Sequence, residues 1–374
     1  MTDSVFERYR VARPRFDEFA WITARLRGAS RLLQFILSDL RPPFHSSAGT
    51  ALQLWLRGFT SRDALVYGLH ERPAGPFISS FAQNVRGARI NGNFDHVVNN
   101  KVVFPLLMKA AGLPAPRHLG TLGRAGLVWE DGRLCAASAE GIELALQRVA
   151  KVVIKPVKGC KGAGLLFLRR KGETVLANEQ PIPRADLDLL LRRLGPAVVT
   201  EFIEQHSYAR ALYARTTNTI RLLTLWDYAS GGPFLAAAAQ RIGNSRSYPA
   251  DNFRAGRGGL SAEIDPAEGV LSRAAGLDGS RQVAWFNEHP ESGVPIAGVQ
   301  VPHWSEAVRS VLSGACALSF APCLAWDMVM TEDSFSVIEI NGGPGLHVHQ
   351  IHRPLLENPR TLAFYRHHGI VNSI

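Results

Sequence analysis

Two apolar alternations separated by a polar tetrapeptide lie near the C-terminal end of the chain. Over residues 326–340 hydrophobic side chains alternate with polar or small ones, and the alternation is interrupted by Thr-Glu-Asp-Ser at 331–334. This pattern predicts a β-hairpin with a four-residue loop. Because successive side chains of a strand point to opposite faces, Glu339 and Asn341 share one face, and Asp327 on the partner strand is placed to join them.

Apolar residues recur at helical or strand spacing over much of the remaining chain. The first 70 residues have mostly helical spacing, and a later apolar helix ends where Gly112 and Pro114 follow it. Runs of apolar and β-branched residues between polar or glycine-rich segments predict strands. The predicted helices are 49–56, 63–69, 102–111, 138–150, 186–194 and 305–317, and the predicted strands outside the hairpin are 126–129, 151–155, 165–168, 197–203 and 235–241.

Composition places the chain among globular proteins of mixed α/β (α+β) class. Its 374 residues are 46% hydrophobic, enough for a sizeable core and roughly two or three domains. No apolar run approaches the ~18 residues that span a bilayer, and the first residues lack the pattern of a signal peptide, so we expect a cytoplasmic protein. The four cysteines form no CxxC pair, which argues against a disulfide scaffold and a zinc knuckle.

The net charge of +10 comes mainly from arginines dispersed along the whole chain. Because they form no stripe, they are weak evidence for nucleic-acid binding, and we expect no nucleic-acid partner. The seven lysines are distributed differently, since all of them lie between residues 101 and 171. Lysine provides a compact charge on a flexible stem, which suits phosphate binding. A local bias of composition is the alternative.

A strand that ends at Lys155 leads into a loop rich in glycine and lysine. The loop runs to Gly164, and a second strand follows it. Backbone N–H groups and lysine charges in such a hairpin can hold phosphates. The segment lacks the GxxxxGK[ST] order and no helix follows it, which excludes a Walker loop. A glycine-rich surface hairpin is the alternative.

Two further segments carry groups suited to a nucleotide. Asn99 and Asn100 precede Lys101 at a predicted helix start, where capping and the helix dipole favour an anion. A solvated lysine is the alternative there. The predicted strand 197–203 ends next to Glu204 and offers backbone groups and a carboxylate to an adenine and a ribose. An apolar hinge between domains explains that segment equally well.

Arg221 and Arg241 lie among apolar residues in two strands that we expect to be central. Buried arginine is rare unless it is paired, so each requires an anionic partner. A structural ion pair with Asp or Glu is one solution, but two such arginines near a carboxylate hairpin favour a phosphate or carboxylate ligand. The basic, glycine-rich loop 252–259 is a second candidate for anion binding, with an exposed turn as the alternative.

The hairpin itself is a candidate metal site. Asp327, Glu339 and Asn341 supply two carboxylates and an amide, and the Gly-Gly-Pro-Gly at 342–345 lets backbone approach a ligand closely. Hard oxygen ligands suit Mg²⁺, which also holds phosphates. A solvent-facing polar edge is the alternative.

Three histidines follow the hairpin at positions 347, 349 and 352. Their spacing allows a zinc site to be considered. Histidines at one end of a helix more often cap carbonyl groups or line a pocket, so zinc is the less favoured interpretation.

These motifs, in this order, resemble the ATP-grasp superfamily. The motifs are Lys155 with its loop, Asn-Thr-Ile-Arg221, Arg241, the Asp-Asn-Phe…Gly-Gly loop, His-Pro-Glu-Ser-Gly, and Trp-Asp…Glu-Ile-Asn-Gly-Gly-Pro-Gly. Within the superfamily the chain is similar to the sugar-transfer-associated branch, over roughly residues 95–352. Each motif is weak alone, whereas six in the same order are a strong indication.

The resemblance implies an ATP-grasp fold, in which two α+β domains clasp ATP between them. The implied organisation is a helical N-terminal region over 1–95, a lead-in helix over 96–118, a small lid domain over 119–204 and a large domain with the magnesium site over 205–374. The first region carries no recognisable chemistry. Of a packing layer, a partner-docking surface and a membrane-surface contact, the packing layer is favoured.

The resemblance also implies roles for individual residues. The chain carries Asn100 where many relatives have an acid before the lysine that matches Lys101. The implied ATP ligands are Lys101, Lys155, Lys161, Gly162, Glu201, Phe202, Ile203 and Glu204; the implied catalytic residues are Arg221, Arg241 and Asn341; and the implied Mg²⁺ ligands are Asp327, Glu339 and Asn341. The basic loop and the histidine segment are placed to contact an anionic substrate, with Asn252, Arg254, Arg257, Gly258, Gly259 and His347 as candidates.

The hypothesis that follows is an ATP-dependent carboxylate–amine ligase that forms an amide through an acyl phosphate. This chemistry needs positioning and charge neutralisation rather than a protein nucleophile, and no Ser-His-Asp or Cys-His pattern stands out. One alternative is a kinase that phosphorylates a small-molecule hydroxyl. Another is a non-catalytic binder of nucleic acid or membrane surfaces. The sequence names neither the carboxylate nor the amine, and it leaves the oligomeric state open.

Overall fold

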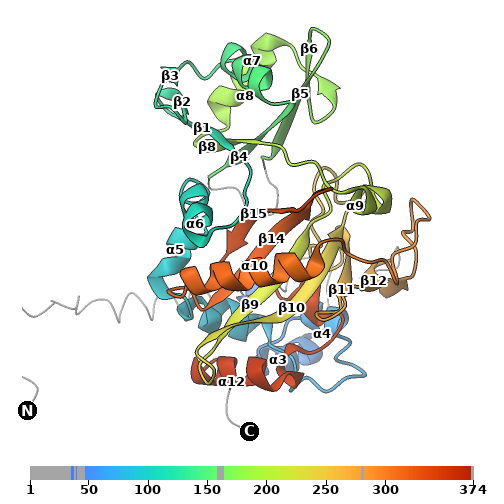
Figure 1. Cartoon of the computed structure of the whole chain (residues 1–374). Coiled ribbons are helices and arrows are strands. Elements are labelled where there is room, and N and C mark those ends of the chain that lie inside the picture. Colours follow the sequence, from blue (N-terminus) through green and yellow to red (C-terminus); the bar gives the residue numbers. More distant parts are fainter. Residues whose placement is uncertain (1–34, 38, 40–46, 158–163, 279–281, 372–374) are drawn as a thin grey trace, which may run out of the picture.

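The computed structural model describes residues 35–37, 39, 47–157, 164–278 and 282–371. Within these ranges the chain forms two antiparallel sheets, each with its own helices, and a helical layer that precedes them (Figure 1). The smaller sheet unit stands at one end of the molecule, above the larger one. The predicted α+β class is therefore confirmed.

The small sheet has eight strands in the order β3-β2-β1-β8-β4-β5-β6-β7. Apolar side chains of β1, β4 and β8 form one core with helices α7 and α8. Helix α7 begins after Ser138, whose hydroxyl accepts a hydrogen bond from the Gly141 N–H and caps the helix. The elements are β1 His118–Gly123, β2 Gly126–Trp129, β3 Leu134–Cys135, α7 Ala139–Arg148, β4 Lys151–Pro156, β5 Leu166–Lys171, β6 Thr174–Ala177, β7 Gln180–Pro181, α8 Arg184–Arg193 and β8 Ala197–Glu201.

The large sheet has seven strands in the order β13-β12-β11-β10-β9-β14-β15. The last hairpin therefore pairs with β9 and not with β13, the strand immediately before it in the chain. The elements are α9 Ser207–Leu212, β9 Ile220–Asp227, β10 Gly232–Ile242, β11 Leu260–Ile264, β12 Leu271–Leu277, β13 Val283–Phe286, α10 Trp304–Ala317, β14 Cys323–Met330, β15 Phe335–Asn341, α11 His347–Gln350, η4 Leu355–Glu357 and α12 Pro359–His367.

The two faces of the large sheet are covered by different helices. Leu222 and Trp326 belong to a core with α10 and with helix α6, Phe104–Ala111, while Leu223 and Leu225 pack towards α12. Figure 1 shows α10 crossing the first face. Arg221 has the same parity as Leu223, so its side chain lies on the face opposite α10. This second face carries the charged residues described below.

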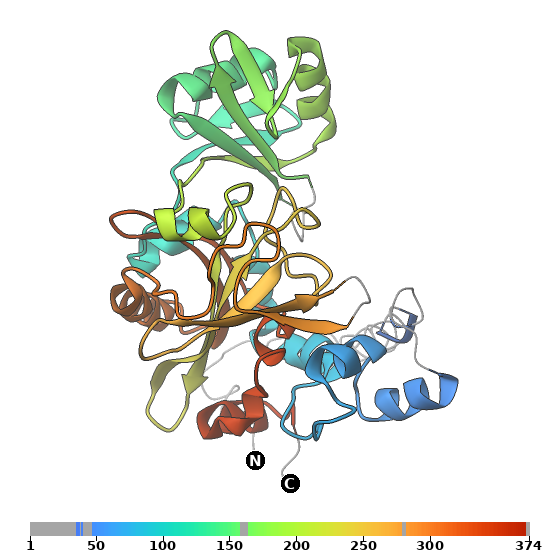
Figure 2. The same cartoon turned by 90° about the vertical axis from the view of Figure 1, so that its right-hand side faces the viewer.

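The N-terminal helices pack on that same second face (Figure 2). Apolar residues of α3 and α4 share a core with Ala239 of β10, Phe253 and Val348. A packing layer was the favoured interpretation of this region, and the described part of it does pack against the large sheet. Its elements are α3 Ala48–Leu56, α4 Ser61–Tyr67, η1 Ala82–Arg86, η2 Gly87–Arg89, η3 Gly92–Phe94 and α5 Asp95–Val98.

The predicted hairpin is confirmed, since β14 and β15 pair antiparallel around the loop 331–334. The helix predicted over 102–111 begins later, at Phe104, because Asn100 accepts a hydrogen bond from the Val102 N–H and holds a turn before it. Lys101 lies in that turn. Gly112 ends the helix as predicted, with a left-handed φ of 66°.

The predicted helix 63–69 also begins at a different residue, Ser61. Thr60 and Asp63 form a capping box, in which each side chain accepts from the other residue's backbone N–H, so the helix starts between them. None of the helices in the described ranges has the length and apolar character needed to cross a membrane.

Candidate active site

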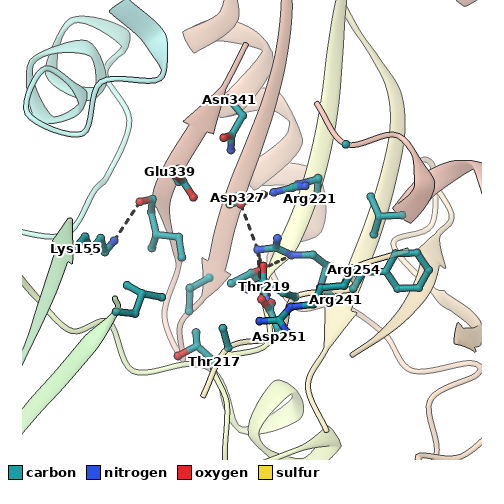
Figure 3. A pocket seen from close by; sticks show the side chains of 18 of the residues that line it. Lys155, Thr217, Thr219, Arg221, Arg241, Asp251, Arg254, Asp327, Glu339 and Asn341 are labelled. Atoms are coloured by element: carbon teal, nitrogen blue, oxygen red, sulfur yellow. Dashed lines mark hydrogen bonds and ion pairs between the residues drawn. The ribbon is translucent and has the colours of Figure 1, made fainter. Parts of the chain in front are cut away.

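A cavity of about 770 Å³ lies where the two sheets and the N-terminal layer meet. Its walls come from β4 and β8 of the small sheet, from β9, β10, β14 and β15 of the large sheet, and from α4 and η1 of the N-terminal layer. Figure 3 shows the charged side chains of the large sheet pointing into it, with Lys155 on the opposite side. The polar and charged lining residues include Arg62, Gln83, Asn84, Lys101, Lys155, Glu201, Thr217, Thr219, Arg221, Arg241, Asp251, Asn252, Arg254, Arg257, Asp327, Glu339, Asn341 and His347.

Buried charged side chains meet on the cavity face of the large sheet. Asp327 lies directly opposite Arg221 on the neighbouring strand, and its carboxylate accepts hydrogen bonds of 2.7 Å from Nε and from Nη2 of Arg221 (Figure 3). Nη2 of Arg241 donates a third bond, of 3.2 Å. Arg241 also pairs with Asp251 at 3.4 Å and donates to Thr219 Oγ1. Two buried carboxylates therefore balance the charges of the two arginines. The sequence left open whether the partner was an Asp or Glu side chain or a bound ligand, and the structure shows ion pairs with Asp.

The charge states in this network follow from burial and pairing. Burial alone would raise the pKa of Asp327, but the Arg221 and Arg241 guanidiniums hold that pKa below its ordinary value. Burial lowers the pKa of Arg221, and Asp327 more than reverses the effect, so the net shift is upward. For Asp251 burial prevails over Arg241 and the Thr219 hydrogen bonds, and its pKa is raised. The Arg221–Asp327 pair is thus held in its ionised form.

The predicted magnesium ligands lie side by side on the hairpin. Asp327 is opposite Glu339 in the ladder, and Asn341 follows on the same strand. A register shift next to this pair leaves both Ile338 and Glu339 lining the cavity. Asn341 also lines the cavity, and its Nδ2 atom is buried without a hydrogen-bond partner.

The donor set fits a magnesium ion. A carboxylate has about four lone-pair sites, and the arginines use three of those on Asp327. One lone-pair site on the Asp327 carboxylate therefore remains for a metal ion, together with the side-chain oxygens of Glu339 and Asn341. Magnesium typically takes one or two carboxylates and completes its shell with water and phosphate oxygens. Within the described ranges no group of three or more His, Cys, Asp or Glu side chains could hold a metal.

The two lysines predicted to bind phosphates lie close to the hairpin. Nζ of Lys155, at the end of β4, donates to the Ile338 carbonyl at 3.3 Å. Nζ of Lys101 lies 3.5 Å from Oε1 of Glu339. Burial lowers the pKa of Lys155, while the charge of Glu339 acts in the opposite direction. Both lysine ammonium groups therefore lie within reach of the hairpin's carboxylates.

The end of β8 forms the small-sheet wall of the cavity. Glu201, Phe202 and Ile203, the residues predicted to contact adenine, all line it. Phe202 is fixed by Lys151, whose carbonyl accepts from its N–H at 3.0 Å and whose Nζ lies 3.8 Å from its ring centroid. Glu204 does not line the cavity. It is exposed and borders an adjacent hollow of about 110 Å³.

The basic loop after β10 is closely anchored to the large sheet. Asp251 accepts hydrogen bonds from the backbone N–H and hydroxyl of Thr219, at 2.7 and 2.5 Å. Asn252 lines the cavity, but Gly258 and Gly259 do not. A Cβ at Gly258 would lie 1.9 Å from the Asn252 carbonyl oxygen, so this glycine permits a close approach of the backbone. Gly258 therefore shapes the loop without facing the cavity.

The three histidines have different surroundings. His347 lines the cavity and lies 2.7 Å from Asp63 of α4, through Nε2 and Oδ1. Nε2 of His352 lies 3.1 Å from the Ser261 hydroxyl. His349 is 3% exposed, and neither ring nitrogen has a hydrogen-bond partner. The three histidines therefore have separate hydrogen-bond surroundings.

Several lining residues were not predicted. Arg62, Gln83 and Asn84 come from the N-terminal layer, to which the sequence assigned no chemistry. Asp251 was seen only as the start of a loop, although it anchors that loop to the sheet. No local motif marks the first three residues, because their approach to the cavity depends on packing over long sequence separations. The predicted Lys161 and Gly162 lie outside the described residues.

Comparison with known proteins identifies the fold. Residues 88–359 match the sequence model of the family described as sugar-transfer associated ATP-grasp. No match is found among curated proteins. Similar solved structures include an N5-carboxyaminoimidazole ribonucleotide synthetase in its ADP complex, with 12% identity and a TM-score of 0.39 over 69% of this chain and 51% of that one.

Two further structures have a comparable likeness. They are a biotin carboxylase from Campylobacter jejuni (13% identity, TM-score 0.41, 74% of this chain and 48% of that one) and a D-alanyl-alanine synthetase A from Vibrio cholerae (10%, 0.42, 74% and 66%). The chain thus spans about half to two thirds of the length of these proteins. The family match covers well over half of the chain, and the protein belongs to the sugar-transfer associated ATP-grasp family.

Proposed function

We propose that this protein is an ATP-dependent ligase that joins a carboxylate to an amine and releases ADP and phosphate. The observation that carries the proposal is the convergence of Lys155, the Arg221–Asp327 pair and Glu339 on one cavity between two sheets. The described part of the lining contains no serine or cysteine that could act as a nucleophile. A site built from fixed charges suits phosphoryl transfer, which depends on positioning and electrostatics.

ATP would lie along the cavity from the small sheet to the hairpin. Phe202 and Ile203 supply an apolar wall and backbone groups for the adenine, and Glu201 supplies a carboxylate. Lys101 and Lys155 would contact the phosphates. By the resemblance, Lys161 and Gly162, which lie outside the described residues, would cover the phosphates, and Glu204 would contact the ribose only from the adjacent hollow that it borders. Mg²⁺, when bound by Asp327, Glu339 and Asn341, would offset the phosphate charge.

In the first step an oxygen of the substrate carboxylate attacks the γ-phosphorus, and the bond from that phosphorus to the bridging oxygen of ADP breaks. Arg221 donates hydrogen bonds to Asp327 through Nε and Nη2. Its remaining nitrogen, Nη1, points towards Gly345, which lines the cavity. The guanidinium is therefore oriented before the reaction begins. A fixed donor of this kind stabilises developing charge without reorganisation.

In the second step the amine nitrogen attacks the acyl carbon. The carbon–oxygen bond to phosphate breaks, phosphate leaves with the electron pair, and the nitrogen loses a proton to give the amide. Arg241 would stabilise the departing phosphate charge together with Arg221. The loop residues Asn252, Arg254 and Arg257, with His347, line the same cavity and would contact the second substrate.

The decisive experiment is ADP release measured against a panel of carboxylates crossed with amines, with mass analysis of the products. A ligase requires both partners and yields an amide, whereas a kinase releases ADP with one hydroxyl acceptor. Lys155→Ala should lower turnover by about a hundredfold, the effect of losing one preorganised donor. Lys109→Ala, an exposed lysine that does not line the cavity, is the matched control. Wild-type turnover in Lys155→Ala would refute the assignment.

One further binding result would count against a catalytic role. Steeply salt-dependent DNA binding without any binding of Mg-ATP would favour a non-catalytic binder. Arg241→Ala is less informative than the lysine variant, because Arg241 is 7% exposed and bridges Asp251 and Asp327. Its removal would leave two buried carboxylates with one partner fewer, so turnover and folding would change together.

A further inference from the structure

The second step of the proposed ligase reaction releases a proton from the amine nitrogen. Most aliphatic amines are protonated near neutral pH, and attack on the acyl carbon requires the free electron pair of the nitrogen. A base within the cavity would therefore accelerate this step. Histidine most often takes such a proton, and among the described residues that line the cavity His347 is the only histidine.

His347 is paired with a buried carboxylate. Its Nε2 atom lies 2.7 Å from Oδ1 of Asp63, which is 0% exposed. Burial alone would raise the pKa of Asp63, but the hydrogen bond from His347 leads the effects that lower it, and the net shift is downward. The carboxylate is thus ionised and accepts, so Nε2 carries the proton. The other nitrogen of the neutral ring, Nδ1, is then an acceptor.

The N-terminal layer fixes both members of this pair. The Asp63 carboxylate accepts hydrogen bonds from the Thr60 N–H at 2.9 Å, and from the Ser80 hydroxyl at 2.7 Å and N–H at 3.3 Å. The imidazole ring of His347 stacks on Tyr67, which is 1% exposed, with ring centroids 5.4 Å apart and planes at 29°. The direction of the ring is therefore set by α4 and the segment that follows it.

The backbone of α11 is attached to the same layer. Oε1 of Gln350 accepts from the Ile78 N–H at 2.8 Å, and Nε2 of Gln350 donates to the Ile78 carbonyl at 2.9 Å. Val348 packs in the core shared with α4. Asp63 and His347 are 284 positions apart in the sequence. Their pairing therefore depends on the docking of the N-terminal layer against α11.

His347 lies near the groups proposed to act on the phosphoryl group. A Cβ built on Gly345 would be 3.8 Å from Nη1 of Arg221. The Cα atoms of Gly345 and His347 are at most ~7.6 Å apart, because two peptide units separate them. The imidazole is therefore close to the part of the cavity where the acyl phosphate would form.

We propose that His347 is the general base of the amide-forming step and that Asp63 is its positioning residue. Nδ1 accepts a proton from the amine nitrogen while the nitrogen's electron pair forms the bond to the acyl carbon. Phosphate leaves with the electron pair of the carbon–oxygen bond, and the imidazolium later gives its proton to water. Asp63 stays ionised, holds the ring in the required tautomer and stabilises the imidazolium. This role rests on the proposed ligase function and adds to it.

The first test reads the tautomer and needs no substrate. Full-length protein with ring-¹⁵N histidine is studied by two-bond ¹H–¹⁵N correlation at neutral pH, and His347→Gln identifies the His347 signals. We expect a protonated Nε2 and a bare Nδ1 in the wild type. Asp63→Asn, whose amide can donate to Nε2, should move the proton to Nδ1. A wild-type ring with a proton on Nδ1, or an unchanged tautomer in Asp63→Asn, would overturn the proposal.

Ser80→Ala is the matched control for Asp63→Asn. It removes another hydrogen bond to the same carboxylate and leaves the pair with His347 in place. A merely structural role for Asp63 predicts the same spectrum for both variants. The proposed role predicts the wild-type tautomer in Ser80→Ala alone.

The second test separates the two chemical steps by rapid quench, with a carboxylate and an amine that give an amide in the crossed panel. In His347→Gln the new amide can still donate to Asp63, and unchanged affinity for AMP-PNP shows that the variant folds. ADP should form in a burst at close to the wild-type rate, and a quench containing hydroxylamine should trap the acyl phosphate as a hydroxamate. Amide formation should fall by about a hundredfold or more, the contribution of a general base. His70→Gln, an exposed histidine that does not line the cavity, should keep both steps.

The outcomes distinguish the base from the ligase function. Amide formation at the wild-type rate in His347→Gln, or an equal loss of both steps in a variant that binds AMP-PNP, overturns the base and leaves the ligase standing. If the wild type forms no amide from any pair in the panel, the ligase function falls, and the step assigned to His347 falls with it.

Discussion

Replacing Asp327 with asparagine removes the charge that holds two buried arginines in place. The carboxylate is 2% exposed and accepts three guanidinium hydrogen bonds of 2.7, 2.7 and 3.2 Å. Asparagine preserves the shape but turns one acceptor oxygen into a donor that faces an arginine N–H. Only Asp251 then remains to balance Arg221 and Arg241. Breaking one partner of a buried pair costs about 3–5 kcal/mol of unfolding free energy, and we expect a loss in that range.

The assay is equilibrium unfolding in urea, with the midpoint and slope fitted separately. A double-mutant cycle with Arg221→Gln should give a coupling energy of about 1.5–3 kcal/mol, the value of charge-assisted hydrogen bonds. Glu263→Gln is the control, because Glu263 pairs with Arg353, whose side chain is 58% exposed, and its effect should be much smaller. A loss below about 1 kcal/mol for Asp327→Asn, or a coupling energy near zero, would refute the role of the buried pair.

Two further predictions concern stability. The pKa values of His349 and His352 are about 3, mainly because burial disfavours their charged forms, against ~6.5 in an unfolded chain. The unfolded chain therefore takes up protons first, and stability that is complete above pH 6.5 should fall by ~1.4 kcal/mol per pH unit for each histidine as the pH drops to 5. His349→Gln should remove about half of that slope in urea unfolding at several pH values, and an unchanged slope would contradict the assignment. Gly342→Ala places a Cβ 2.1 Å from Asp95 Oδ1 and should cost about 1–3 kcal/mol. Gly343→Ala, with open space around its Cβ, should be nearly neutral, and equal thermal midpoints for the two variants would exclude this steric explanation.

Local pattern was sufficient for much of the fold. The period-two alternation around residues 326–340 predicted the bounds of both hairpin strands to within a few residues. Gly112 correctly predicted the C-terminal end of α6. Starts of helices were less predictable, because they depend on side-chain hydrogen bonds such as the Thr60–Asp63 capping box. Strands β11 to β13 were not predicted. Alanine and serine weaken the apolar period of β11 and β12, and β13 has only four residues.

The candidate site was harder to predict because its contacts join distant segments. Sequence reasoning recognised that Arg221 requires an anion but could not name Asp327 as its partner. That pairing depends on β14 lying next to β9, and chain order alone would not place the hairpin there. Arg62 is a sharper example, because nothing in its neighbourhood of the sequence distinguishes it from the many other arginines. Only packing of α4 on the large sheet brings it to the cavity.

The wall formed by Arg62, Gln83 and Asn84 lies upstream of residue 88, where the match to the family begins. The residues proposed to hold the nucleotide all lie downstream of that position. One wall of the cavity is therefore encoded outside the stretch that matches the family, and that wall is tied to the rest by the Asp63–His347 contact and by a core shared with Phe253 and Val348. Any exchange of the segment before residue 88 between relatives would have to preserve these contacts, which are therefore the residues to keep when that wall is redesigned.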